Sequence, residues 1–284
     1  MRKAIVILGG AAAAGTIAWL SASRHWIAES ARLTRRVRES AVRPEDRVRL
    51  ASLSSTPELV RRYFRIALGE GAPFVRTARV VQMGEFRSKE TDDVEAGWQA
   101  FEARQVFSAG PPGFVWDARI SMAPVGRVWV RDGYVDGTAS LRAALFGLIP
   151  VASEADSPEL RAGALQRYLA ESVWFPSALL PSERLTWSEI DASHARATLK
   201  DGEVTASLDF EFGLGGEIIA VSTPSRPRAA GRGRYTYLPW GGRYQRYEER
   251  GGMRVPLESE VYWVVGGKEQ PYYRGRNIEI AYED

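Results

Sequence analysis

Carboxylates are the side chains of this 284-residue chain with the widest choice of chemistry. Two of them held about 5 or 9 Å apart can hydrolyse a glycosidic bond, one as the acid and the other as nucleophile or base. Structural explanations compete with this chemistry: Asp-Gly pairs are typical of turns, an acid one helical turn from an arginine forms an ion pair, and Asp117 can pair with an arginine of a neighbouring strand. The candidates near aromatic runs are Asp117, Asp132, Asp136, Glu171 and Asp191.

The sequence gives little support for catalysis or metal binding by histidine or cysteine, or for nucleotide binding. The chain has two histidines and no cysteine, which excludes disulfides, thiolate metal sites and cysteine nucleophiles. His25 lies beside an apolar run, and His194 lies at a turn with no G-x-S-x-G elbow to present a serine to it. The H-E-x-x-H, P-loop and G-x-G-x-x-G motifs are absent as well. We therefore expect no catalytic residue, no metal site and no cofactor.

Basic charge is concentrated at the N-terminus. Residues 1–49 contain 10 Arg or Lys against 4 acidic residues, whereas the rest of the chain contains 28 against 31. A protein that reads nucleic acid normally carries its basic patch on the folded domain. We therefore expect no nucleic-acid partner.

An uncharged run over residues 4–22 follows Arg2 and Lys3. Its length is close to the roughly 20 residues that a helix needs to cross a bilayer. Segment 1–23 is therefore either a single-pass signal anchor in the cell membrane, which we favour, or a signal peptide cleaved after small residues. Residues 24–55 would form a basic stalk lying on anionic headgroups, but the positive-inside rule would place these arginines in the cytoplasm. The membrane side therefore stays open.

The elements that must position any site begin at residue 56. Apolar residues over 56–71 recur at helical spacing, and from about residue 75 the period changes to 2, with Gly-Gly and Asp-Gly pairs between short runs. Segment 157–182 interrupts this pattern with a helix opened by Ser157 and Pro158. Segment 223–234, rich in Pro, Gly and Arg, is expected to be a loose loop.

This pattern predicts a single mainly β, α+β domain over residues 56–284. Hairpin signals between about 11 strands indicate one curved antiparallel sheet, and the inserted helix must bury its apolar stripe against that sheet. We therefore expect helices to cover the concave face, and an apolar helix to precede the domain.

Large apolar side chains are the strongest signal of function. The run PPGFVWDARI at 111–120 alternates, so Phe114 and Trp116 should point inward and Asp117 outward. Aromatic residues of this size are most often core, but a curved sheet with few helices need not close completely, and the unfilled part would be an apolar pocket. The residues predicted to line it are Phe114, Trp116, Phe146, Leu148, Trp174, Phe175, Trp187 and Trp263.

Several motifs resemble an uncharacterised bacterial family placed with the LolA-like superfamily of lipoprotein carriers and lipid-binding envelope proteins. They are GEFR, PPGFVWDARI, YVDGTASL, RYLAESVWFPSALLPS and GGMRVP, and the match runs from about Pro57 to Tyr282. The resemblance implies a half-barrel with an apolar cavity under its helices and a domain outside the cytoplasm. The chain departs from the lipoprotein carriers in its apolar N-terminal run, which precedes no acylatable cysteine.

Three hypotheses follow. The leading one is a membrane-associated, non-enzymatic domain that binds a lipid, an acyl chain or a lipidated protein in the cavity. The second is a structural or interaction protein of the cell envelope with a filled core. The third is a hydrolase that uses two of the five carboxylates.

Overall fold

A computed structural model describes residues 2–42, 47–87, 93, 95–122, 124, 126–231 and 233–283, with residues 2–15 and 52 described by their backbone alone. The helices are α1 (Arg2–Ser40), α2 (Glu58–Ala67) and α3 (Pro158–Glu171), with short 3₁₀ turns η1 (Leu50–Leu53), η2 (Ser172–Trp174) and η3 (Pro176–Leu179). The strands are β1 (Thr77–Phe86), β2 (Gln99–Ala109), β3 (Pro112–Met122), β4 (Gly126–Val135), β5 (Thr138–Leu145), β6 (Ile149–Glu154), β7 (Leu185–Glu189), β8 (His194–Asp201), β9 (Val204–Phe212), β10 (Ile218–Ala229), β11 (Tyr235–Arg250), β12 (Met253–Val265) and β13 (Lys268–Glu283).

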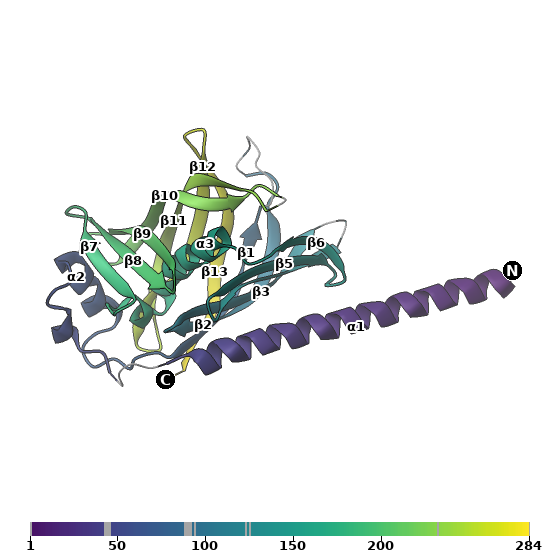
Figure 1. Ribbon diagram of the computed structural model, residues 1–284, viewed down its shortest axis with the longest axis horizontal. Helices are drawn as coiled ribbons and strands as arrows, with labels where there is room; N and C mark the ends of the chain where they lie inside the picture. The colour runs from purple at the N-terminus through teal and green to yellow at the C-terminus, as the bar shows by residue number, and fades with distance from the viewer. Residues whose placement is uncertain are drawn as a thin grey trace.

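The strands form one curved antiparallel sheet (Figure 1). Their order is β6-β5-β4-β3-β2-β1-β13-β12-β11-β10-β9-β8-β7, so nearly every strand pairs with its neighbour in sequence and β1 pairs with β13. This is the mainly β half-barrel that the sequence predicts, with 13 strands where about 11 are expected. The meander follows from the hairpin turns, because two antiparallel strands need only a short connection.

Helix α3 lies in the one connection that joins the two edges of the sheet. It follows β6 and precedes β7, and these strands stand at opposite ends of the strand order. The connection crosses the hollow of the curved sheet, and Figure 1 shows α3 inside that curve. Ser157 caps the helix as predicted, since its hydroxyl accepts a hydrogen bond from the Leu160 amide at 3.1 Å.

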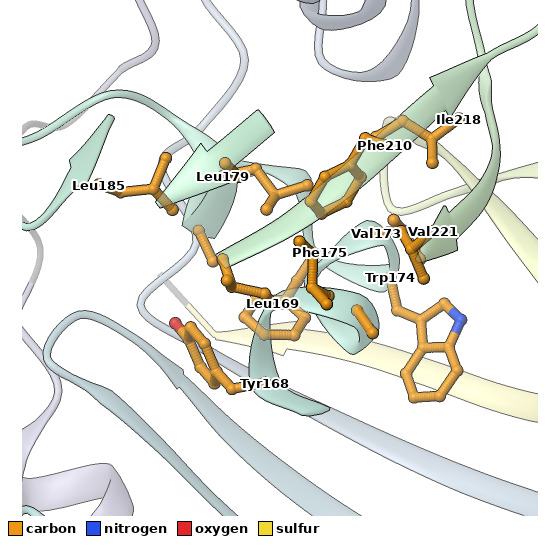
Figure 2. Close-up of a cluster of buried hydrophobic side chains, with 14 of the residues drawn as sticks. Tyr168, Leu169, Val173, Trp174, Phe175, Leu179, Leu185, Phe210, Ile218 and Val221 are labelled. Carbon is orange, nitrogen blue, oxygen red and sulfur yellow. The ribbon is translucent and has the colours of Figure 1, made fainter. Parts of the chain in front are cut away.

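The core fills the space between α3, the 3₁₀ turns η2 and η3 and one end of the concave face (Figure 2). Leu169, Phe175 and Leu179 are completely buried there. Phe175 packs against Phe107 of β2 with ring centroids 4.7 Å apart. The Tyr168 hydroxyl donates to the Ser108 carbonyl at 2.8 Å, so this polar atom is satisfied inside the core.

Helix α1 packs on the outer face of the sheet with its C-terminal half. Trp26 Nε1 donates to Asp117 Oδ1 at 3.2 Å, and Arg36 Nε donates to Asp136 Oδ2 at 2.9 Å. Val37 is buried against three valines of β2, β3 and β4. Part of the segment expected as a stalk is therefore a layer of the domain.

The N-terminal half of α1 extends beyond the sheet (Figure 1). Within the described part of the chain, no helix is both long and apolar enough to cross a membrane. Most of the apolar run at 4–22 lies outside the residues with described side chains, so the anchor stays a prediction.

Two segments bear on the predicted site. The run around Phe146 forms the end of β5, a turn and β6. Segment 223–234 is not a loop throughout, because β10 continues to Ala229 and pairs with β11 on both sides of a register shift between Thr223 and Arg226. Such a bulge lets a strand accommodate prolines that cannot donate to the ladder.

Candidate ligand-binding cavity

A cavity of about 550 Å³ lies beside α3 between the two halves of the curved sheet. One wall comes from β3 to β6, the other from β10 to β13, and the floor from the last turns of α3 and Trp174. The cavity reaches the end of the half-barrel that carries the β1–β2, β3–β4 and β5–β6 turns, because Phe86, Met122 and Val151 line it there. We call this end the open end.

The first wall is aliphatic. Alternate residues of the same strands point into the cavity, as the period of 2 requires. They are Ile120, Met122, Val128, Val130, Leu141, Ala143 and Val151. This group of aliphatic side chains suits the hydrocarbon part of a ligand.

The floor and the opposite wall are aromatic, and Trp116 of β3 adds a further ring from the first wall. Trp116 Nε1 donates to Gln82 Oε1 at 2.9 Å, and Trp240 Nε1 donates to the Tyr272 hydroxyl at 3.0 Å. These hydrogen bonds fix the ring orientations. The aromatic residues of the lining are Phe86, Trp116, Trp174, Trp240, Tyr244, Tyr272 and Tyr273.

A charged cluster occupies the floor. Arg167 Nη1 donates to Asp132 Oδ2 at 2.6 Å and Arg167 Nε donates to Glu171 Oε1 at 2.9 Å. Glu171 Oε2 accepts from Gln105 Nε2 at 2.7 Å. The guanidinium also lies over the ring of Trp116, 5.0 Å from its centroid. Arg167 therefore joins α3 to β4 and to the aromatic floor.

The pKa shifts in this cluster follow from burial and pairing. Burial lowers the pKa of Arg167, but Glu171 and Asp132 more than reverse the effect, so its pKa lies above the ordinary value. Burial raises the pKa of Glu171, and the Arg167 charge and the Gln105 hydrogen bond oppose that rise. The cluster is thus a tightly paired structural unit.

The five candidate carboxylates have separate surroundings. Only Asp132 and Glu171 come together, and both bind Arg167. Asp117 lies on the outer face as predicted, bonded to Trp26, and Asp136 pairs with Arg36 on the same face. Asp191 accepts from the Ser193 and His194 amides of its own turn, and the Ser193 amide hydrogen bond, with help from His194, lowers its pKa to about 2.

Two of the predicted lining residues, Trp116 and Trp174, line the cavity. Phe114 and Phe175 are completely buried in the core next to it. Trp187 packs on Phe210 with centroids 5.0 Å apart, and Trp263 stacks on Tyr272 at 6.0 Å. Phe146 and Leu148 are exposed in the β5–β6 turn, outside the lining.

Sequence reasoning missed Trp240 and Arg226, which both line the cavity. Arg226 belongs to the segment expected as a loop, and Trp240 lies within the long β11, which pairs with that segment. The aliphatic wall had a usable signal, because the alternation that turns Trp116 inward also turns Ile120 and Met122 inward.

A second hollow of about 600 Å³ lies at the other end of the half-barrel, between η1, η3 and the turn at Gly110. Its rim carries Arg49, Glu183 and Arg184. The first cavity is the better candidate because its walls are apolar side chains of regular strands.

Comparison with known proteins gives a family and a distant structural likeness. The model of a "Family of unknown function (DUF6920)" matches residues 54–282. No curated protein matches the sequence. The structure is similar to a LolA superfamily protein from Nitrosomonas europaea, with 11% identity over 84% of this chain and 94% of that chain and a TM-score of 0.44. It is also similar to a domain described as an outer membrane lipoprotein-sorting protein from Vibrio parahaemolyticus, with 8% identity over 73% and 85% of the two chains and a TM-score of 0.42.

Proposed function

The chain belongs to the family of unknown function DUF6920, and from the geometry of its cavity we propose that it is a membrane-associated, non-enzymatic protein that binds the acyl chain of a lipid or of a lipidated protein. The observation that carries this proposal is the apolar cavity of about 550 Å³ beside α3. Its volume lies within the range of about 300–1,000 Å³ typical of small-molecule sites.

The cavity follows from the way α3 fills the half-barrel. The 3₁₀ turns after α3 seal one end with Val173, Phe175 and Leu179, all completely buried. Towards the open end the wall of β3 to β6 has no such layer against it, and its aliphatic side chains face the cavity. Covering them with a hydrocarbon chain would contribute about 0.8 kcal/mol of favourable binding free energy for each buried methylene. The hypothesis of a filled core is disfavoured for the same reason.

The open end of the half-barrel lies on the side towards which α1 extends. Arg36 pairs with Asp136 after the end of β4, and Trp26 packs edge-on against Trp129 near its start, with centroids 6.0 Å apart. Lower residue numbers of α1 therefore lie beside lower numbers of β4. The β5–β6 turn lies beyond Trp129, since the Phe146 amide donates to the carbonyl of Arg127 at 2.8 Å.

The turn at this end exposes an unusual amount of apolar surface. Phe146 and Leu148 are each 41% exposed, and the following edge strand exposes Ile149 and Val151. Isolated exposed apolar residues need no explanation, but a contiguous group suggests an interaction site. If residues 4–22 insert in a membrane, this turn and the open end of the cavity face the bilayer. We propose that the domain lies outside the cytoplasm with segment 1–23 retained as an anchor, or released by cleavage as the alternative.

Ligand binding is tested with a neutral fluorescent probe. The full chain should bind N-phenyl-1-naphthylamine with enhanced fluorescence, and native mass spectrometry of the purified protein should show co-purified lipid. Ala143→Phe places a ring in the cavity and should weaken probe binding at least tenfold, with little change in Tm. Ala100→Phe on the outer face of β2 is the control, because Ala100 is exposed next to Gln99 of the lining. Equal binding by both variants would contradict the proposal.

The membrane-facing orientation is tested by single-site labelling, which is simple because the chain has no native cysteine. An environment-sensitive fluorophore on Leu148→Cys should shift to the blue when the full chain is reconstituted in anionic vesicles. The same fluorophore on Glu203→Cys should not shift, because Glu203 is exposed in the β8–β9 turn at the opposite end. A blue shift at Glu203 alone would reverse the orientation.

A carboxylate hydrolase is the second candidate, because Asp132 and Glu171 share one cavity. Both oxygens of Glu171 are engaged, one by Arg167 and one by Gln105, which leaves none for a substrate. Hydrolysis of aryl glycosides by the full chain that is lost in Glu171→Gln would restore this candidate.

A further inference from the structure

Arg226 is a cation without a counter-ion in an apolar cavity. It lines the cavity from β10, and its guanidinium carbon lies 4.4 Å from the ring centroid of Trp240 and 5.9 Å from that of Trp263. Over the described ranges of the chain, no carboxylate lies within ion-pair distance of it, and its Nη1 is buried without a hydrogen-bond acceptor. Arg167, on the same lining, binds two carboxylates.

The fold leaves this charge uncompensated at close range. Burial lowers the pKa of Arg226 and the nearby Arg167 charge lowers it further, and Tyr272, Asp132 and Glu171 only partly oppose this. Both of these carboxylates are bound to Arg167. Stacking on indole rings is attractive but supplies no acceptor for the guanidinium donors. A buried charge normally has a partner, so the missing partner points to a ligand.

Hydrogen-bond donors without acceptors in the cavity lining indicate the chemistry of that ligand. Among the described residues that line the cavity, two buried side-chain nitrogens lack an acceptor, Nη1 of Arg226 and Nε1 of Trp174. Both nitrogens are hydrogen-bond donors, so a ligand that satisfies them must carry hydrogen-bond acceptors. The planar guanidinium matches the two oxygens of a carboxylate or a phosphate.

Arg226 is placed for a head group near the open end. Arg226 pairs with Leu238 of β11 and lies over the ring of Trp263. Trp263 stacks on Tyr272. Tyr272 in turn packs against Phe86, which ends β1 at the open end. The aliphatic wall faces it across the cavity. An amphipathic molecule could thus place its head at Arg226 and its chain against that wall.

We propose that Arg226 binds the oxyanion head, a carboxylate or a phosphate, of the amphipathic ligand whose acyl chain fills the cavity. This inference rests on the proposed function and adds the chemical class of the head group. Arg226 then carries a cost in stability for the sake of binding, a common arrangement in functional sites.

The test compares ligands of equal chain length and different heads on the full chain at pH 8. Displacement of the neutral probe gives dissociation constants for dodecanoate, monododecyl phosphate and dodecanol. Wild type should bind at least one anion roughly 10- to 100-fold more tightly than the alcohol, as expected for a charge-assisted hydrogen bond. The stronger of the two anions identifies a carboxylate or a phosphate source.

Variants assign the preference to Arg226. Arg226→Met should abolish the preference for the anion while dodecanol still binds, and Arg226→Lys should retain part of it. Arg142→Met is the matched control, because Arg142 is exposed beside Leu141, on the opposite face of β5 from the cavity. Because Arg226 lacks a partner, Arg226→Met should leave Tm unchanged or higher.

The outcomes separate the inference from the proposed function. Equal binding of anion and alcohol by wild type would overturn the role of Arg226 and leave acyl binding intact. Retention of the preference in Arg226→Met, or a fall in its Tm as large as that of Arg167→Met, would also overturn it. Binding of neither probe nor any dodecyl ligand by wild type would remove the proposed function itself.

Discussion

Replacing Arg167 by Met should destabilise the protein strongly, in contrast to the same change at Arg226. Arg167 holds Asp132 at 2.6 Å and Glu171 at 2.9 Å, and its side chain is mostly buried. Met retains the apolar stem that packs near Trp116 but removes the charge. Two carboxylates then remain on the cavity floor without their cation.

The magnitude follows from the loss of one partner of a buried ion pair, which costs about 3–5 kcal/mol. At about 2–4 °C per kcal/mol for a domain of this size, Tm should fall by roughly 6–20 °C. Arg196→Met is the control, because the Arg196–Asp209 pair is well exposed on the Arg196 side. An exposed pair contributes about 0–1 kcal/mol.

The loss of unfolding free energy caused by Arg167→Met should increase with pH. Without Arg167, the pKa of Glu171 rises further above its ordinary value of about 4.3, because burial acts unopposed by that charge. When the pKa of an acid is raised on folding, the stability it contributes is full below the unfolded pKa and is lost as the pH rises through the folded pKa. The deficit should therefore be larger at pH 7.5 than at pH 5.

The assay is urea unfolding followed by tryptophan fluorescence at both pH values. Addition of Asp132→Asn and Glu171→Gln to Arg167→Met should restore much of the loss, since the two carboxylates left without Arg167 are then replaced by neutral amides. A deficit below 1 kcal/mol at pH 7.5, or one equal at both pH values, would refute this account of the cavity floor.

Two further predictions concern the ligand and α1. In a series of fatty acids from eight to eighteen carbons, affinity should rise about fourfold per methylene and level off once the cavity is full. Displacement of the fluorescent probe measures the affinity. An affinity that does not depend on chain length would contradict the cavity as the binding site. Trp26→Ala should lower the free energy of unfolding by about 3 kcal/mol, since Trp26 packs on Trp129 and bonds to Asp117; a loss below 1 kcal/mol would mean that α1 contributes little to the domain.

Local patterns in the sequence were sufficient for the fold class and for the faces of the strands. Alternation placed Trp116 inward and Asp117 outward, and the structure agrees. Ser157 and Pro158 marked the start of α3. These features are predictable because the period of a strand and the cap of a helix depend on residues close in sequence.

The composition of the cavity depended on contacts between distant segments. Arg226 lies in a segment whose prolines indicated a loop, and only its pairing with β11 brings it to Trp240. Phe146 and Leu148 turned outward because their run broke into a turn between β5 and β6.

By itself, the sequence determined that this chain is a meander of strands interrupted by one capped helix, because those signals are local. Only the tertiary structure decided that α3 crosses between the two sheet edges and leaves one end of the half-barrel unfilled. It also decided which arginine is paired. Arg167 and Arg226 are the same residue type on one lining, and the distances set by the folded sheet give one of them two carboxylates and the other none at ion-pair distance among the described residues.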